Sequence, residues 1–281
     1  MSYMVRIGVV ALALLLVAGP VEAQKKRAKK KPAADKPAKS LKVDVARDRA
    51  ALLGDDATAA SAAAARLGLT TQPGALDALL DGLSLGLDPS VAAAALDGLV
   101  NHGKPIGYDV IEHYTHYRNA RVRAAAVAAI GALDDNRAVK DVLHALTDGD
   151  DLVRAAAAKV VAARKLKQGV PPLLELLKKG DEGSAEAIAE LATPDLAKEV
   201  GELIGVAPDA LLARCLGLIL MRPGFKPEEA RVEVVRAIGK IPGNDALEQL
   251  TTYVASIPET PPRQSRREAE AIVEARLTGG D

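Results

Sequence analysis

The sequence predicts an all-α fold, an α-solenoid in which antiparallel helix pairs of about 31 residues stack into a superhelix. One observation is a repeat: DPSVAAAALDGLV (88–100), NARVRAAAVAAIGAL (119–133) and DDLVRAAAAKVVAAR (150–164) align without gaps at a spacing of 31 residues. A second is the composition, which is 49% hydrophobic but only 2% aromatic, with no Trp and a single Phe. A core of Ala, Leu, Val and Ile suits closely packed helices better than sheets.

The first 23 residues read as a secretory signal peptide. Arg6 precedes an apolar run from Ile7 to Ala18, and cleavage is expected after Ala23. The run has about twelve residues, whereas a spanning helix needs roughly 20. We therefore expect a periplasmic or secreted protein. The alternative is an uncleaved leader that anchors the chain in the membrane, because the basic stretch QKKRAKKK after the cut favours retention.

Residues 24–49 are expected to form a disordered linker rich in Lys, Pro and Ala, which cannot bury a core. Within it, residues 25–42 contain nine Lys or Arg and one Asp, and the charges of Arg6 and Glu22 cancel, so residues 43–281 carry a net charge of −8. Such a basic arm suits lipid headgroups or other anionic envelope polymers through charge alone. The acidic remainder argues against nucleic acid as the main ligand, and a solvated spacer explains the arm equally well.

Residues 50–257 are expected to form the repeat domain, each unit consisting of two helices. In the unit that starts at Asn119, an N-cap residue, apolar side chains recur every three or four positions as far as Leu133. After the turn at residues 134–136, a second apolar face follows. The period loosens after Gly180, where residues 184–205 suggest a shortened pair. Residues 229–241 then match the first-helix pattern, with Arg231 in the place of Arg123.

The last segment, 258–281, is expected to be a Pro-rich break followed by a charged C-terminal helix over 265–277 that caps the array. Gly98, Gly131 and Gly239 lie inside predicted helices, where they would permit close packing. The single cysteine, Cys215, lies in an apolar run and is expected to be a buried structural thiol.

The pattern Asn119, Val122, Arg123 and Ala126, followed by Ile130-Gly131, resembles the HEAT-repeat family, and Asp150, Val153, Arg154 and Ala157 repeat it. The resemblance covers roughly residues 50–257, although Ala92 replaces the Arg in one unit. In this family the Arg typically bonds a capping acid of the neighbouring repeat. The resemblance therefore implies a structural ladder of four residues, with Arg123 bonded to Asp150: Asn119, Arg123, Asp150 and Arg154.

The stretch GYDVIEHYTHYRNARVR (107–123) contains three of the five tyrosines and two of the four histidines. It is the second helix of its unit, where Ile111 and Tyr114 should be buried. In solenoids of this kind the second helices line the concave surface, and tyrosine is enriched at interfaces. We therefore expect a partner-binding patch made of five residues: Glu112, His113, His116, Tyr117 and His144.

Three alternatives to a partner-binding patch differ in the chemistry they require. Zinc-binding helices space two histidines at i and i+4 with the Glu between them, and EHYTH has the wrong order and spacing, so no metal is expected. No paired carboxylates in a recognisable motif, phosphate-binding Gly-rich loop or nucleophile elbow points to catalysis. The third alternative is that the tyrosines only fill a gap in the packing.

The sequence therefore predicts a non-catalytic scaffold or adaptor of the cell envelope that binds another protein on a concave face formed by second helices, without a cofactor. The alternative comes from a different class. Short HEAT-like repeats also occur in lyases that attach chromophores to phycobiliproteins, so a lyase or chaperone for a bulky cofactor is the second hypothesis.

Overall fold

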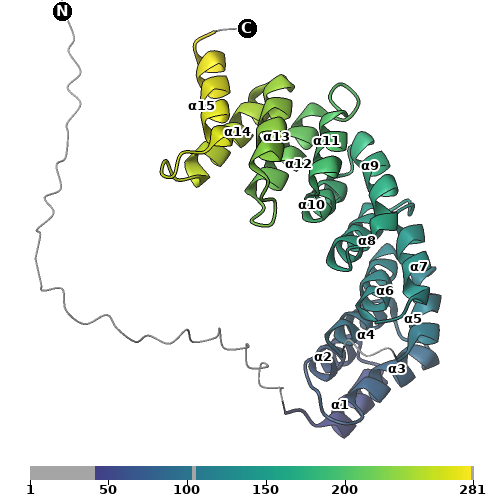
Figure 1. The fold of residues 1–281 in the computed structure, drawn as a ribbon. Helices are drawn as coiled ribbons and strands as arrows, with labels where there is room; N and C mark the ends of the chain where they lie inside the picture. Colours follow the sequence, from purple (N-terminus) through teal and green to yellow (C-terminus); the bar gives the residue numbers. More distant parts are fainter. Residues whose placement is uncertain (1–41, 103–105, 280–281) are drawn as a thin grey trace, which may run out of the picture. The chain divides into compact units, whose positions relative to one another are not determined.

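The computed structural model describes residues 42–102 and 106–279, and the predicted signal peptide and most of the predicted linker lie outside them. The described residues form an all-α solenoid, which confirms the predicted fold class (Figure 1). No helix of these two stretches is long and apolar enough to span a lipid bilayer.

Fifteen α-helices occur in the described residues, and from α2 onward they pair in chain order. The first helices of the pairs are α2 (Ala57–Gly68), α4 (Pro89–His102), α6 (Ala120–Ala132), α8 (Asp151–Ala163), α10 (Glu182–Leu191), α12 (Asp209–Met221) and α14 (Asn244–Ser256). The second helices are α3 (Ala75–Leu85), α5 (Tyr108–Thr115), α7 (Arg137–Ala145), α9 (Val170–Lys178), α11 (Pro194–Gly201), α13 (Glu228–Lys240) and α15 (Gln264–Leu277). A 3₁₀ turn, Lys167–Gly169, leads into α9.

The folded part begins earlier than predicted. Helix α1 (Val45–Leu52) packs against α2 and α3, so residues 45–49 belong to the array and not to the linker. The Asp44 carboxylate caps α1 by accepting from the Arg47 amide. Inside the helix, Asp48 is buried and accepts two hydrogen bonds from the Arg66 guanidinium, which offset the cost of burying its charge. A charged pair can therefore hold this terminal helix where the apolar periodicity is weak.

Side-chain caps start most of the first helices. The carboxylates of Asp56, Asp150 and Asp181 and the amide of Asn119 each accept from a backbone N–H in the first turn of the helix that follows. These caps satisfy N–H groups that have no partner inside the helix. The predicted N-cap at Asn119 is thereby confirmed.

The first helices approach one another closely because small residues line their contacts. A Cβ atom on Gly68 would lie 2.4 Å from the Cα of Gly98, and one on Gly131 would lie 2.4 Å from a Val160 methyl. The predicted role of the helical glycines in close packing is confirmed at Gly98, Gly131 and Gly239. The backbones of α2 and α4 meet directly at the first of these contacts.

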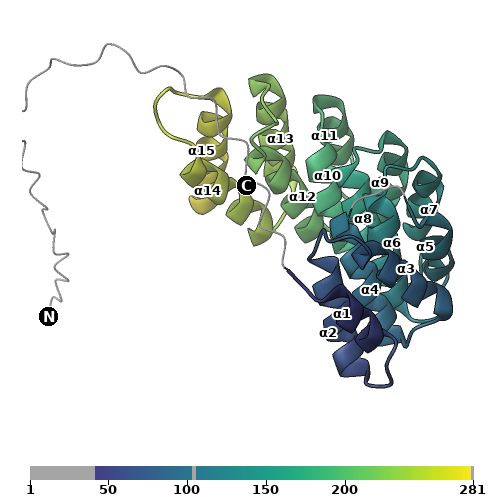
Figure 2. The same ribbon diagram turned by 90° about the horizontal axis from the view of Figure 1, so that it is seen from below.

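The second helices carry larger side chains, such as Leu, Tyr and His, and lie farther apart. The array therefore bends toward the alanine-rich first helices, which lie on the inner side of the curve in both views (Figures 1 and 2). The expectation that second helices form the concave face is wrong for this chain. Small side chains shorten the spacing of one layer only, and that layer becomes the inner one.

The last two pairs differ from the sequence-based expectation. The sequence pattern aligns α13 with the first helices, but α13 packs between α11 and α15 in the second layer. Its Arg231 is only 6% exposed and donates to the Leu220 carbonyl and to the Tyr253 hydroxyl, so it does not repeat the surface role of Arg123. The predicted terminal helix corresponds to α15, which covers α13 and α14 and ends the array.

Candidate functional site

The structure brings the predicted patch together at the ends of two neighbouring second helices, α5 and α7. The imidazole rings of His116 and His144 lie 6.0 Å apart, although the two residues come from different repeats. The Tyr117 ring stacks on the Tyr114 ring at 5.6 Å. Since Tyr114 is buried and donates its hydroxyl to the Leu83 carbonyl, it holds Tyr117 in a fixed place at the surface.

Glu112 and the two histidines of α5 form a small charged group. The Glu112 carboxylate lies 3.6 Å from the Nδ1 of His113 and 3.8 Å from the Nε2 of His116. His113 is also close to the Asp109 carbonyl, at 2.7 Å from Nδ1. Side-chain exposures of 80% for His113 and 60% for His116 leave both rings accessible to a partner.

Beside the patch, α5 and α7 enclose a cavity of about 420 Å³, called here the α5–α7 pocket. Its lining includes His116, Tyr117 and His144 of the patch, while His113 and Glu112 lie outside the lining. Arg123, from α6, also lines the pocket, and the other lining residues come from the same two helix ends and the loops that follow them: Thr115, Arg118, Asp141, Ala145, Thr147 and Asp148. A partner side chain can therefore enter between the predicted residues and does not have to lie flat across them.

One side chain of this pocket, Asp141, escaped sequence reasoning. It is 7% exposed, and its carboxylate accepts a hydrogen bond of 2.6 Å from the Tyr108 hydroxyl. That hydrogen bond is the main cause that raises the pKa of Tyr108 to about 12, and burial acts in the same direction. The Arg137 guanidinium lies over the Tyr108 ring at 4.0 Å from its centre. A signal existed in the repeat, because the equivalent positions one period away are Val110 and Pro172.

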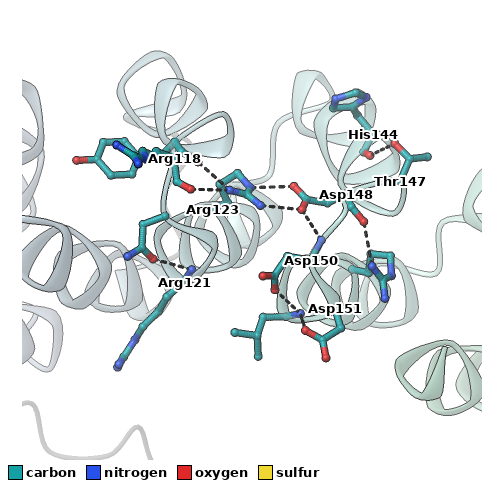
Figure 3. Close-up of polar contacts among 12 residues, drawn as sticks. Arg118, Arg121, Arg123, His144, Thr147, Asp148, Asp150 and Asp151 are labelled. Atoms are coloured by element: carbon teal, nitrogen blue, oxygen red, sulfur yellow. Dashed lines mark hydrogen bonds and ion pairs between the residues drawn. The ribbon is translucent and has the colours of Figure 1, made fainter.

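The predicted ladder exists, but with a different acid. Arg123 donates to both oxygens of Asp148 at 2.8 Å, and its third nitrogen donates to the carbonyls of Tyr117 and Arg118 (Figure 3). The predicted partner, Asp150, is instead occupied as the N-cap of α8, where it accepts from the Leu152 amide. The prediction that Arg123 bonds Asp150 is therefore wrong by two positions.

Asp148 connects the ladder to the next repeat. Its carboxylate accepts from the Asp150 amide, and its carbonyl accepts from Arg154, whose Nε donates to Asp181 at 2.6 Å. The Arg123 hydrogen bonds lower the pKa of Asp148, and the Asp150 amide adds to this, whereas burial opposes it. Links of this kind fix the turn that carries Tyr117 and the loop that follows α7, the helix of His144.

A second cavity lies on the inner layer, between α8, α10 and α12, with a volume of about 510 Å³. Its floor consists of alanines and Gly183, and three glutamates of α10 stand along it at intervals of four residues: Glu182, Glu186 and Glu190. Arg214 pairs with two of them, at 2.9 Å from Glu186 and 3.7 Å from Glu182. Most of the charge in this inner groove is thus satisfied within the fold.

Neither cavity has the donor set of a metal centre. Across the described stretches, no three His, Cys, Asp or Glu side chains come close enough together to hold a metal ion. Cys215 is fully buried, burial raises its pKa to about 12, and its Sγ lies 3.7 Å from the Ala185 carbonyl.

A protein-family model matches part of the chain. The family model described as HEAT repeats matches residues 108–193, which run from the start of α5 to just beyond α10. The resemblance to HEAT repeats is confirmed over that part of the chain. Among curated proteins, none matches the chain.

Solved structures of similar architecture exist at low identity. The complex of CpcE and CpcF of phycocyanin lyase from Nostoc sp. PCC7120 is similar at 15% identity, with a TM-score of 0.47, over 89% of this chain and 99% of that chain. An engineered protein is similar at 19% identity, with a TM-score of 0.37, over 85% of this chain and 98% of that chain. A second engineered protein is similar at 19% identity, with a TM-score of 0.41, over 84% of this chain and 79% of that chain.

Proposed function

We propose that the chain is a non-catalytic scaffold that binds another protein through the patch and the α5–α7 pocket. The observation that carries this proposal is the convergence of Tyr117, His116 and His144 from two repeats around one cavity. In the described residues only Tyr253 lies outside α5 and its adjoining turn among the tyrosines, and it is buried. The accessible aromatic surface is therefore concentrated here.

The rigidity of this surface also supports a binding role. Tyr117 is stacked on a buried ring, and its carbonyl accepts from Arg123, so the side chain needs little ordering when a partner binds. Pre-ordered aromatic side chains reduce the entropy that association costs, and they are common among the residues that dominate binding energy. The partner contacts the outer layer of helices and not the inner curve.

Binding is tested with the full chain as bait in extracts of the cell envelope, followed by mass spectrometry. The double variant Tyr117→Ala/His113→Ala should lose the captured partner, with a loss of more than about 1 kcal/mol per residue. A control variant in the inner groove, Lys159→Ala/Glu190→Ala, should retain it. The patch proposal is wrong if the control loses the partner and the patch variant does not.

The cellular location belongs to the same proposal. The predicted signal peptide, with cleavage near Ala23, would export the chain, and the basic arm that follows would reach anionic envelope polymers or lipid headgroups. The intact mass of the chain isolated from its native source tests this. A mass that includes residues 1–23 supports the membrane-anchored alternative instead.

A further inference from the structure

Among the described residues of the α5–α7 pocket, one buried carboxylate has a neutral hydroxyl as its hydrogen-bond donor and no cation beside it. Asp141 accepts from the Tyr108 hydroxyl, a neutral donor. Within residues 42–102 and 106–279 it belongs to no ion pair, unlike the other buried acid, Asp48, which is paired with Arg66. A buried carboxylate without a cation is unfavourable, so a ligand that brings a positive charge next to it would be favoured.

The acids and bases around Asp141 favour a cation as that ligand. Glu112, four residues after Tyr108 on α5, adds a second carboxylate on the same helix, and the Arg137 guanidinium over the Tyr108 ring is already paired with Asp109 and Asp135. The only basic groups paired with Glu112 among the described residues are His113 and His116.

Two arginines, Arg118 and Arg123, also line the pocket, and their positive charges could repel a cationic ligand. All the hydrogen bonds of Arg123 go to Asp148 and to two carbonyls, so its charge is already compensated. Arg118 is exposed at the pocket mouth, where water screens its charge. The buried Asp141 carboxylate is screened far less, and it determines the sign of charge that the interior of the pocket accepts.

The aromatic walls fit the same ligand. Tyrosine faces attract ammonium and guanidinium groups at distances below about 6 Å. The protein already uses such a contact on the neighbouring surface, where Arg137 covers one face of Tyr108. Tyr117 offers a further ring beside the cavity, and it is half-buried and held by stacking.

From these contacts we infer that the α5–α7 pocket receives a lysine or arginine side chain of the partner protein, with its cationic head next to Asp141 and its aliphatic stem along Tyr117. This inference rests on the proposed scaffold function and specifies the partner: it presents a basic residue in an exposed segment. Charge complementarity and not apolar burial then determines which segments bind.

The test uses the full chain, labelled for NMR, and five-residue peptides with a central lysine, arginine, norleucine or glutamate between alanines. The lysine and arginine peptides should shift signals of α5, α7 and the loops that follow them. Asp141→Asn keeps an acceptor for Tyr108 and removes only the charge, and it should weaken both peptides at least fivefold. Glu175→Gln, an exposed acid on the next second helix, is the matched control and should leave binding unchanged.

The thermal midpoint of unfolding is a second measurement, and it distinguishes a ligand-binding role of Asp141 from a structural one. If Asp141 serves a ligand, Asp141→Asn should leave the thermal midpoint unchanged or raise it, because an unbalanced buried charge is removed. A lower midpoint together with unchanged peptide binding would assign Asp141 a purely structural role and overturn the inference. Glu112→Gln, at the half-exposed edge, should weaken the peptides without affecting folding.

Other outcomes separate this inference from the scaffold proposal. Equal binding of the norleucine peptide would show that the pocket selects apolar segments, and preferential binding of the glutamate peptide would make Arg118 the anchor. Either result overturns the inference. A captured partner that is lost with Tyr117→Ala but retained with Asp141→Asn overturns it too, while the scaffold function stands.

Discussion

Asp148 is the residue through which two neighbouring repeats are joined, because both its carboxylate and its carbonyl accept from arginines. Arg123 and Asp148 are each less than one-fifth exposed at the side chain, so the pair is partly protected from solvent. Sequence reasoning foresaw an arginine ladder but assigned it to Asp150. In the sequence, Asp148 and Asp150 are equally suitable partners for Arg123. In the structure Asp150 caps α8, and Asp148 is the acid that accepts from Arg123.

The pH dependence of stability should reveal this pair. The folded-state pKa of Asp148 is lowered, mainly by Arg123, so its contribution is present at neutral pH and is lost as the pH falls below about 4. The stabilities of the wild type and of Asp148→Asn in urea should therefore differ at pH 7, and the difference should shrink as the pH falls below about 4. A difference that stays constant over this range would mean that the Arg123 contact contributes nothing to folding.

Cys215 offers a separate measurement at the same scale. Its thiol is fully buried and its pKa is raised to about 12, so it is both inaccessible and protonated at pH 8. We expect no reaction with a thiol reagent in the native chain and full reaction in concentrated guanidinium chloride. In a Cys215→Ala background, Leu53→Cys on the exposed end of α1 should react at once, which controls for the reagent.

At the scale of elements, the inner layer depends on backbone contacts that allow no side chain. A Cβ on Gly68 would lie 2.4 Å from the Gly98 Cα, and the obstacle is backbone, which cannot rotate away. Gly68→Ala should therefore push α2 and α4 apart and lower the free energy of unfolding by about 1–3 kcal/mol. Gly149→Ala is the control, because its Cβ would meet nothing within 4 Å.

Chemical unfolding of both variants by urea, followed by circular dichroism, measures this difference. An equal stability for the two variants would show that α2 and α4 adjust without cost.

Gly68 also illustrates why the sequence does not predict the direction of curvature. The direction of the bend depends on which of the two helix layers has the smaller side chains, taken over all the pairs. The sequence repeat describes each helix separately and does not compare the layers.

The helices themselves were largely predictable from sequence, whereas the pocket was not. Strict spacing of 31 residues and caps such as Asn119 locate α4, α6 and α8, since each unit repeats the same local signals. Tyr117, His116 and His144 were found because aromatics and histidines are rare in this chain. Asp141 was missed because the repeat marks its position only as one where the neighbouring units have Val110 and Pro172, and its burial follows from its contact with Tyr108 of α5.

For the whole molecule, the last helix pair determines whether the array ends in a closed surface. Tyr253 of α14 and Ser265 of α15 are buried, and they share hydrogen bonds with Arg231 and Glu228 of α13. A chain that ends at Pro242 lacks both helices and leaves Arg231 with fewer partners. We expect it to associate and to unfold at a lower temperature, because an uncapped repeat exposes an apolar face.

Light scattering after gel filtration, together with thermal unfolding, checks this expectation. A chain that ends at Leu277 keeps α15 complete and should behave like the full chain. If the chain ending at Pro242 stays monomeric with an unchanged midpoint, α14 and α15 have no capping role.

The links between repeats have a consequence for the mechanics of this protein. In the described parts of the chain, no side-chain hydrogen bond joins residues more than 37 positions apart. A pull on the two ends of the array therefore loads each repeat interface in series, and no long-range contact clamps the ends together. We expect force to extend the molecule in a succession of small steps, one helix pair at a time, and the pairs to re-form in any order when the force is released.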